Sequence, residues 1–385
     1  GFTDGTSNFF TNGRGHIDIT ISGGTIGNDY EYIVPNATNI TAAGIAETDI
    51  SKWTATEWST WKTYHHISKT EFDTATGRLT HTKGGNVFAG GMGRFYQLDG
   101  TTPISSVDWW KLGNVKSTKL TITGGNIKSS VYGGGELGMV QVTHTTEDSK
   151  AVSTEVTVNG GVIGTEVEDG GTVKYTYGSV FGGGYGSLLE KLTHTSSSDP
   201  YVSYPKYIAG RVKGSTAVTI SGSAAVKASV YGGGEMAAVG ESKVLYTSAD
   251  QVLGETLTGE GGNPMVANTY VTISGGTIGK AKDTENNIYY GGAKMGNVYG
   301  GGSGYHNTVR SGHIYGNTNV SISGGTIYHN IYGGGAYGTV GDFTYETRPE
   351  DGAPKVYGVN GLHSDRTGTG TANVTITGGT IGYDG

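Results

Sequence analysis

Two short phrases of sequence decide the fold of this chain, V271-T-I-S-G-G-T-I278 and V298-Y-G-G-G302. In the first phrase apolar residues alternate with polar ones, so Val271 and Ile273 point to one face and Thr272 points to the other, which is the periodicity of a β-strand. The Gly-Gly pair is expected to turn the chain, because glycine adopts positive φ without steric cost. Thr-Ile then restarts a short strand, and V-Y-G-G-G forms a third.

Both phrases recur along the whole chain. Copies of the first phrase lie at residues 19–26, 120–127, 156–163, 218–226, 271–278, 320–327 and 374–381. Copies of the second phrase lie at residues 87–91, 131–135, 180–184, 230–234, 298–302 and 331–335. Similar units stacked at the roughly 4.8 Å strand spacing cover one another's apolar groups and backbone hydrogen bonds. The sequence therefore predicts an all-β protein, a parallel β-helix (β-solenoid) with the usual right-handed coil.

Insertions between the phrases alternate along the chain. Odd-numbered copies run through Ile-Gly into an inserted segment, as at Ile278-Gly279, whereas even-numbered copies run almost directly into the second phrase, as at Ile127-Lys128. This predicts a single repeat solenoid over residues 1–385, with six full rungs and one partial rung in two-rung units. β-Hairpins and loops are expected to leave the stack between rungs, and Met139–Thr145 with Ala151–Val158 are predicted to be the arms of one hairpin.

The largest insertion, residues 28–86, contains most of the tryptophans. One amphipathic helix is predicted there from the spacing of Ile50, Trp53, Glu57, Trp58, Trp61 and His65. The tryptophans either form a local core for the insertion or present their rings as a platform for sugar faces. In the second case the carbohydrate- or partner-binding residues are Trp53, Trp58, Trp61, Trp109 and Trp110.

One aromatic residue occupies the same place in every second phrase. Stacking in register would form an aromatic ladder that stabilises the repeats, whether the rings face outward or fill a corner. The ladder residues are Phe88, Tyr132, Phe181, Tyr231, Tyr299 and Tyr332.

The phrases VTISGGTIG, at 271–279, and VYGGG, at 298–302, resemble the repeats of large Gly-rich surface or secreted proteins of gut-type bacteria, especially Bacteroidetes. The resemblance covers the phrases and not the insertions. It implies a cell-surface or extracellular location and a β-helical or related solenoid body, and it implies no particular activity.

Composition argues against several classes of function. The chain has no cysteine, which excludes disulfides and thiolate metal sites, and a net charge of −7 offers no basic field for nucleic acid. No apolar run reaches the roughly 20 residues of a membrane-spanning helix, so we expect a soluble chain without membrane insertion. The phrases carry almost no charge and the histidines lack metal-ligand spacing, so no enzyme, no cofactor and no metal site is expected.

Three functions follow from these patterns. The leading one is an extracellular structural protein that forms or extends a surface filament by head-to-tail β-stacking with itself, or as a window of a longer chain. Its assembly residues lie in the terminal rungs: Ile17, Ile19, Ile21, Val374, Ile376 and Ile381. The alternative is an adhesin that binds glycans or a host surface through the Trp-rich insertion, with the solenoid as stalk. The third is a polysaccharide-degrading β-helix enzyme, which needs acidic residues such as Glu166, Glu168 and Asp169 to converge with a lysine.

Overall fold

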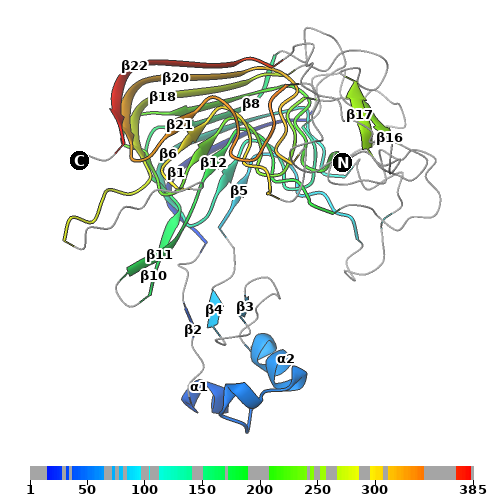
Figure 1. Ribbon diagram of the computed structural model, residues 1–385, viewed down its shortest axis with the longest axis vertical. Helices are drawn as coiled ribbons and strands as arrows, with labels where there is room; N and C mark the ends of the chain where they lie inside the picture. Colours follow the sequence, from blue (N-terminus) through cyan, green and yellow to red (C-terminus); the bar gives the residue numbers. More distant parts are fainter. Residues whose placement is uncertain are drawn as a thin grey trace, which may run out of the picture.

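The secondary structure of the protein is mostly β-strand, with few helices (Figure 1). It is known from a computed structural model that describes the repeated phrases, their close connections and part of the insertions. The described residues are 15–27, 32–33, 37–64, 72–73, 78–80, 85–96, 104, 112–140, 151–169, 172–189, 208–240, 243–246, 252–256, 267–285, 295–306, 311–341 and 370–382.

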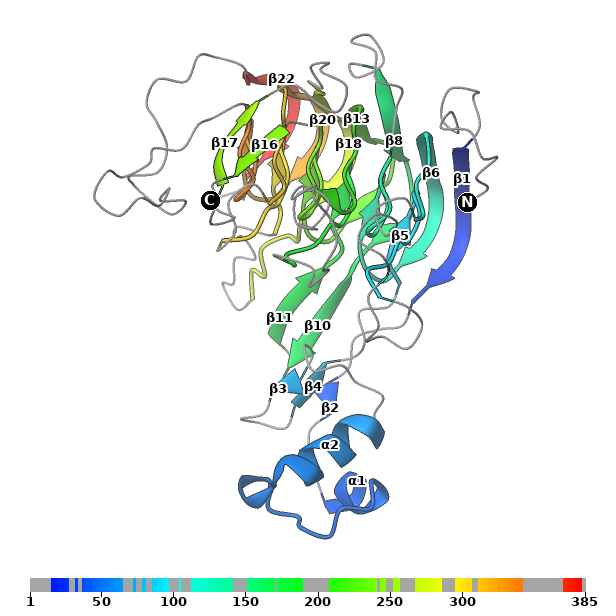
Figure 2. The same cartoon turned by 90° about the vertical axis from the view of Figure 1, so that its right-hand side faces the viewer.

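The larger sheet has nine parallel strands, all of which come from copies of the first phrase. Neighbouring strands pair in register, so that Val271 lies beside Val320 and Ile273 beside Ile322. The sheet extends from β1 at one edge to β22 at the other (Figure 2). Its strands are β1 (His16–Ile26), β6 (Ser117–Ile127), β8 (Val152–Val158), β9 (Val162–Ile163), β13 (Ser215–Ile220), β14 (Ala225–Val226), β18 (Thr269–Ile278), β20 (Thr318–Ile327) and β22 (Ala372–Ile381).

The smaller sheet comes from the second phrases and has six parallel strands of two residues each. In sequence order its strands are β5 (Val87–Phe88), β7 (Val131–Tyr132), β12 (Val180–Phe181), β15 (Val230–Tyr231), β19 (Val298–Tyr299) and β21 (Ile331–Tyr332). A further line of isolated parallel bridges joins Val115, Val140, Val212, Val239, Ile314 and Val340.

This arrangement corrects the predicted fold, because the parallel β-helix with three short strands in each rung is wrong. The repeated phrases form two distinct parallel sheets. In the third and fourth copies the first phrase is divided into two strands, β8 with β9 and β13 with β14, at residues 159–161 and 221–224. In the other five copies the Gly-Gly pair does not turn the chain between strands. It lies within β18, where the pairing register shifts between Ile273 and Ser274 and again before Thr277. Gly276 has a φ of 76°. A register shift with a glycine at positive φ is the mark of a β-bulge, so the glycines bend a continuous strand.

Hairpins occur at other places than the one predicted. Val152–Val158 is β8, a parallel strand of the large sheet, and not the second arm of a hairpin; residues 141–150 lie outside the described residues. Three antiparallel hairpins are described elsewhere: β3 (Phe72–Asp73) with β4 (Arg78–Thr80), β10 (Thr165–Asp169) with β11 (Thr172–Tyr177), and β16 (Lys243–Tyr246) with β17 (Val252–Thr256). β4 also pairs with β2 (Tyr32–Ile33).

An apolar core joins the two sheets. It contains the inward Val and Ile residues of the first phrase and the aliphatic residue of the second, such as Ile273 and Val298, which are both fully buried. Because equivalent residues pair across neighbouring strands, each aliphatic side chain is covered by its counterparts in the adjacent repeats.

A buried threonine ties the two sheets together within each interior repeat. Thr269 is fully buried, and its hydroxyl donates a hydrogen bond of 2.5 Å to the carbonyl oxygen of Gly300, which follows β19. The same bond recurs at 2.5 to 2.7 Å from Thr118 to Gly133, Thr154 to Gly182, Thr216 to Gly232 and Thr318 to Gly333. Each bond satisfies two polar groups that burial would otherwise penalise.

The insertions of the odd-numbered repeats leave the sheets through a pair of touching glycines. In the second repeat three residues, 128 to 130, connect Ile127 to Val131. In the third repeat the same three places are taken by Gly164, Gly178 and Ser179, with the β10–β11 hairpin inserted after Gly164. A Cβ on Gly178 would lie 2.0 Å from the Cα of Gly164, so only glycine fits. Gly27 with Gly85 and Gly279 with Gly296 repeat this neck.

The necks predict that insertions can be removed without loss of the sheets. Joining Gly27 directly to Gly85, with residues 28–84 deleted, leaves the three-residue connection of the even-numbered repeats. We expect amide hydrogen exchange in β6 and β18 to stay as slow as in the full chain, while the helical circular-dichroism signal falls. Fast exchange throughout β6 would show instead that the insertion supports the first repeats.

The threonine bond predicts a large difference between two substitutions in β18. Thr269→Val keeps the shape of the side chain but leaves the buried Gly300 carbonyl without its donor, which should lower the free energy of unfolding by about 1–3 kcal/mol. Thr272→Val on the exposed face of the same strand should change it little. Denaturant titration of both variants measures the two values, and equal losses would contradict the assignment.

Candidate functional site

The six aromatic residues of the second phrases stack into one continuous column along the smaller sheet. Neighbouring ring centroids are 4.6 to 4.9 Å apart and neighbouring planes are inclined by 4 to 17°. The interior rings of the column are buried on one side of the smaller sheet, and Tyr231, for example, is 1 % exposed. Tyr332, at the end of the column, is 41 % exposed. The aromatic ladder is therefore structural along its length and open at one end.

Hydroxyl groups beside the column are held protonated. The Tyr132 hydroxyl donates to a carboxylate oxygen of Glu235, two repeats away, and the ring of Tyr185 stands at 88° to that of Tyr132. Burial, followed by the nearby carboxylates of Glu235 and Glu136, raises the pKa of Tyr185 to about 12. Burial also raises the pKa of Tyr132. Such groups serve as hydrogen-bond donors near neutral pH and not as nucleophiles.

The tryptophans of the first insertion form a small local core. Trp61 is fully buried and Trp53 is 7 % exposed, and both pack with Ile40, Ala43 and Ile45, while Trp58 packs against them and is partly buried. This core lies far from the two sheets (Figure 1). The buried faces of the Trp53 and Trp61 rings contact the other side chains of this core. Trp109 and Trp110 lie outside the described residues.

Three short helices surround this core, where the sequence predicted one. They are α1 (Ala37–Ala42), the 3-10 helix η1 (Ile50–Lys52) and α2 (Ala55–Tyr64). The predicted helix is broken between Lys52 and Ala55 because each side has its own cap. Thr54 and Glu57 form a capping box at the start of α2; the predicted His65 lies outside the described residues.

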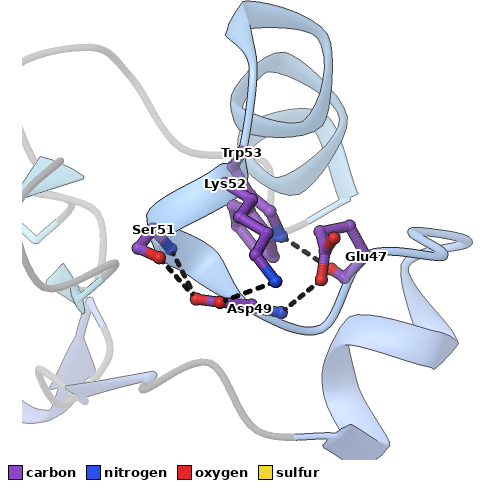
Figure 3. A network of polar contacts seen from close by, with 5 residues as sticks. All are labelled: Glu47, Asp49, Ser51, Lys52 and Trp53. Atoms are coloured by element: carbon purple, nitrogen blue, oxygen red, sulfur yellow. Dashed lines mark hydrogen bonds and ion pairs between the residues drawn. The ribbon is translucent and has the colours of Figure 1, made fainter.

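Polar contacts hold the turn at η1 (Figure 3). The Asp49 carboxylate accepts hydrogen bonds of 3.1 and 2.7 Å from the backbone N–H and hydroxyl of Ser51, and it pairs with Lys52 at 3.2 Å. The hydrogen bond from the Ser51 hydroxyl, followed by Lys52, lowers the pKa of Asp49. The indole N–H of Trp53 donates to the carbonyl oxygen of Glu47 at 2.7 Å. These contacts hold Trp53 in the core.

Glu166 is the one proposed acidic residue whose side chain is described, and it does meet lysines. Its carboxylate contacts the Lys227 Nζ at 3.0 Å and the Lys280 Nζ at 2.5 Å, which links the hairpin of the third repeat to the fourth and fifth repeats. Burial raises the pKa of Glu166, but the hydrogen bonds from Lys280 and Lys227 outweigh it, so the pKa lies below its ordinary value. A glycosidase acid needs the opposite shift, so these contacts fit a structural bridge.

The two edge strands of the large sheet expose side chains that are buried in every interior strand. Val374, Ile376 and Ile381 of β22 are 42, 51 and 41 % exposed, whereas Ile322 in the neighbouring β20 is fully buried. On the opposite edge, Ile17, Ile19 and Ile21 of β1 are partly buried. All six of the predicted assembly residues thus lie on the two outer strands.

Sequence reasoning missed a ladder of side-chain oxygens that precedes the smaller sheet. In each repeat, the side-chain oxygen of a Ser or Asn accepts the backbone N–H of its counterpart in the next repeat. The bonds measure 3.0 to 3.3 Å and join Asn86, Ser130, Ser179, Ser229, Asn297 and Asn330. The sequence contains a pattern that could have predicted this ladder, because the residue before each second phrase is always Ser or Asn.

We compared the chain with protein-family models, with curated proteins and with solved structures, and none of them matched. The resemblance of the phrases to Gly-rich bacterial surface proteins therefore stays a prediction. Within the described ranges no three His, Cys, Asp or Glu side chains gather as a metal site, and no described helix is long and apolar enough to cross a membrane.

The Glu166 bridge predicts a pH-dependent stabilisation. A carboxyl group with a lowered pKa stabilises the folded state above the pKa of the unfolded chain, and this contribution is lost as pH falls through the folded pKa. Glu166→Gln should therefore speed amide exchange in β10 and β11 at pH 7, and the difference from the unsubstituted chain should begin to shrink below the ordinary pKa of a glutamate and vanish once the folded carboxylate is protonated. An unchanged difference in acid would contradict an ionic bridge. Glu155→Gln, on the exposed face of β8, is the control.

Proposed function

We propose that this chain is an extracellular structural protein whose copies assemble end to end into a filament. The observation that carries the proposal is the exposure of Val374, Ile376 and Ile381 on β22. An exposed strand with apolar side chains and an open backbone edge favours pairing with another strand. The same phrase, paired in register, covers these positions in every interior strand.

A second copy offers the matching edge, because β1 carries the same phrase. Continuing the register from β20 to β22 would set Ile19 of the next copy beside Val374, and Ile21 beside Ile376. Parallel strands paired in this way bury like against like, as in the interior of the sheet. The contact has a direction, since β1 and β22 form opposite edges.

Two positions of the edge strands differ from the interior in complementary ways. Where interior strands have the buried threonine, β1 has Ile17 and β22 has Ala372. In the proposed contact the larger side chain would lie beside the smaller one. Asp18 would lie beside Asn373, whose amide already donates one hydrogen to Asn319 and has a second to offer a carboxylate.

The contact would run through the large sheet alone. β21 is the last strand of the smaller sheet, one repeat before β22, and β5 belongs to the same repeat as β1. Pairing of β1 with β22 would leave β21 and the next copy's β5 two strand spacings apart, about 9.6 Å. The extracellular location rests on the resemblance of the phrases and on the cysteine-free composition.

Single cysteines test the contact, because the chain contains none of its own. Thr20→Cys in β1 and Thr375→Cys in β22 would be brought to about 4.8 Å between Cα atoms, within the range of a disulfide. We expect an oxidised mixture of the two variants to give disulfide-linked dimers joining residue 20 to residue 375, as mapped by mass spectrometry of the linked peptides.

The matched control is Thr219→Cys, at the same place of the phrase in the interior strand β13, which should form no dimer with either variant. Dimers that join only residue 20 to itself, or residue 375 to itself, would mean that like ends meet and would overturn the head-to-tail arrangement. Absence of any dimer at concentrations where light scattering detects assembly would also overturn it.

A further inference from the structure

The aromatic column encloses the ring of Tyr132 on both faces. Phe88 stacks on one face at 4.6 Å between ring centroids and Phe181 stacks on the other at 4.9 Å, with ring planes inclined by 17 and 6°. The ring of Tyr185 meets Tyr132 edge-on at 5.9 Å. Tyr132 itself is 2 % exposed. Water and dissolved molecules are therefore kept away from this ring.

The hydroxyl of Tyr132 has a base as its hydrogen-bond partner. It donates to Oε2 of Glu235, a partly exposed residue that follows the fourth of the second phrases. Burial, followed by the negative charge and the hydrogen bond of Glu235, raises the pKa of Tyr132, so the proton stays on the phenol near neutral pH. The proton can still cross to Glu235 when a reaction makes the phenol more acidic, because donor and acceptor are already within hydrogen-bond reach.

Removal of one electron from a tyrosine is a reaction of this kind. A phenol that has lost an electron is a strong acid and releases its hydroxyl proton. In an interior without water the electron leaves readily only where a base takes that proton, so a buried tyrosine that donates to a carboxylate is the easier one to oxidise. Phe88 and Phe181 have no hydroxyl proton to release, so the oxidised state stays on Tyr132 and does not pass along the column.

A second buried tyrosine of the column has different neighbours. Tyr231 is 1 % exposed, and the side chains that hydrogen-bond with its hydroxyl are Ser303 and Ser229. The hydroxyl of a serine does not take up a proton near neutral pH. Burial is thus common to both rings, whereas a hydrogen bond to a carboxylate distinguishes Tyr132 from Tyr231.

We infer that Tyr132 and Glu235 form a redox-active pair, which gives an electron to a one-electron oxidant and holds the resulting tyrosyl radical. The electron passes to the oxidant, the O–H bond of Tyr132 breaks, and its proton forms a new O–H bond at Oε2 of Glu235. The products are the reduced oxidant, a neutral phenoxyl radical and a protonated carboxyl group. A one-electron reductant reverses the reaction, and the proton then returns to Tyr132.

Tyr185 provides a path between the pair and the surface. Its side chain is partly exposed, and its ring contacts that of Tyr132. The carboxylates of Glu235 and Glu136 lie close enough to act on the hydroxyl of Tyr185, and nearby negative charge favours removal of an electron from a ring. An oxidant at the surface can therefore take its electron through Tyr185 without entering the column.

The redox pair does not depend on end-to-end assembly, because Tyr132, Tyr185 and Glu235 belong to interior repeats and not to β1 or β22. Cysteine cross-linking reports on the contact between β1 and β22, and radical formation reports on the smaller sheet. The two proposals can therefore fail separately.

The probe is the one-electron oxidant tris(bipyridine)ruthenium(III), generated by flash photolysis in a solution of the full chain. We expect tyrosyl radicals, seen by transient absorbance and electron paramagnetic resonance, to decay in a fast phase from exposed tyrosines and a slow phase from the shielded Tyr132. The chain contains 25 tyrosines, so variants assign the slow phase. Tyr132→Phe keeps the stacked ring but should abolish this phase. Tyr231→Phe, at an equally buried ring of the same column, is the matched control and should retain it.

Glu235→Gln tests the proton acceptor, because it keeps the size of the side chain and removes its basic carboxylate. Formation of the slow-phase radical should become about a hundredfold slower, the scale of a lost proton acceptor. Tyr185→Phe should also slow the formation of this radical but leave its decay unchanged. Amide exchange in β7 and β15 checks that each variant keeps its fold.

Three results would overturn the redox pair. They are the absence of a slow phase in the unsubstituted chain, a slow phase that survives Tyr132→Phe, and a slow phase that Tyr231→Phe removes to the same extent. An unchanged rate of radical formation in Glu235→Gln would overturn the assignment of Glu235 as the proton acceptor.

Discussion

The close approach of neighbouring backbones at the Gly-Gly-Gly segments is the constraint on which the rest of the structure depends. A side chain at Gly182 would collide with the carbonyl oxygen of Gly232 at 2.3 Å, and with the threonine that binds that carbonyl. Only with bare backbone here can the second phrases pair, the aromatic rings stack and the buried threonines reach across from the large sheet. The aliphatic core then fills the space that these contacts define.

The elements that follow from local pattern could be predicted from the sequence. Alternation in the first phrase predicted the inward Val and Ile residues, and the common place of the aromatic residues in the second phrase, from Phe88 to Tyr332, predicted the stacked rings. The Gly-Gly pair could not be assigned in the same way, because positive φ at Gly276 suits a turn and a bulge equally. What decides between them is the neighbouring strand, which pairs on both sides of the glycines. No single phrase of the sequence specifies this long-range pairing.

The same distinction separates the candidate sites that the repeat pattern predicts from those that long-range contacts create. The edge residues Val374 and Ile376 could be named from the repeat because the edge is a property of repeat order. The Glu166 bridge could not, since the lysines that it meets come from two other repeats, 61 and 114 residues along the chain. The break in the predicted helix of the first insertion could have been predicted from the sequence, because T54-A-T-E57 is a capping box that marks the start of a helix at residue 55.

The glycine necks separate the length of a repeat from its place in the sheets. Gly164 and Gly178 stand where the second repeat has Lys128 and Ser129, so the strands on either side meet their neighbours in the same way whether thirteen residues or none lie between (165 to 177). A repeat protein built like this has no fixed sequence period, although its strand spacing is constant. Its lateral surface can therefore diversify by exchange of whole loops while the cross-section of its sheets stays unchanged.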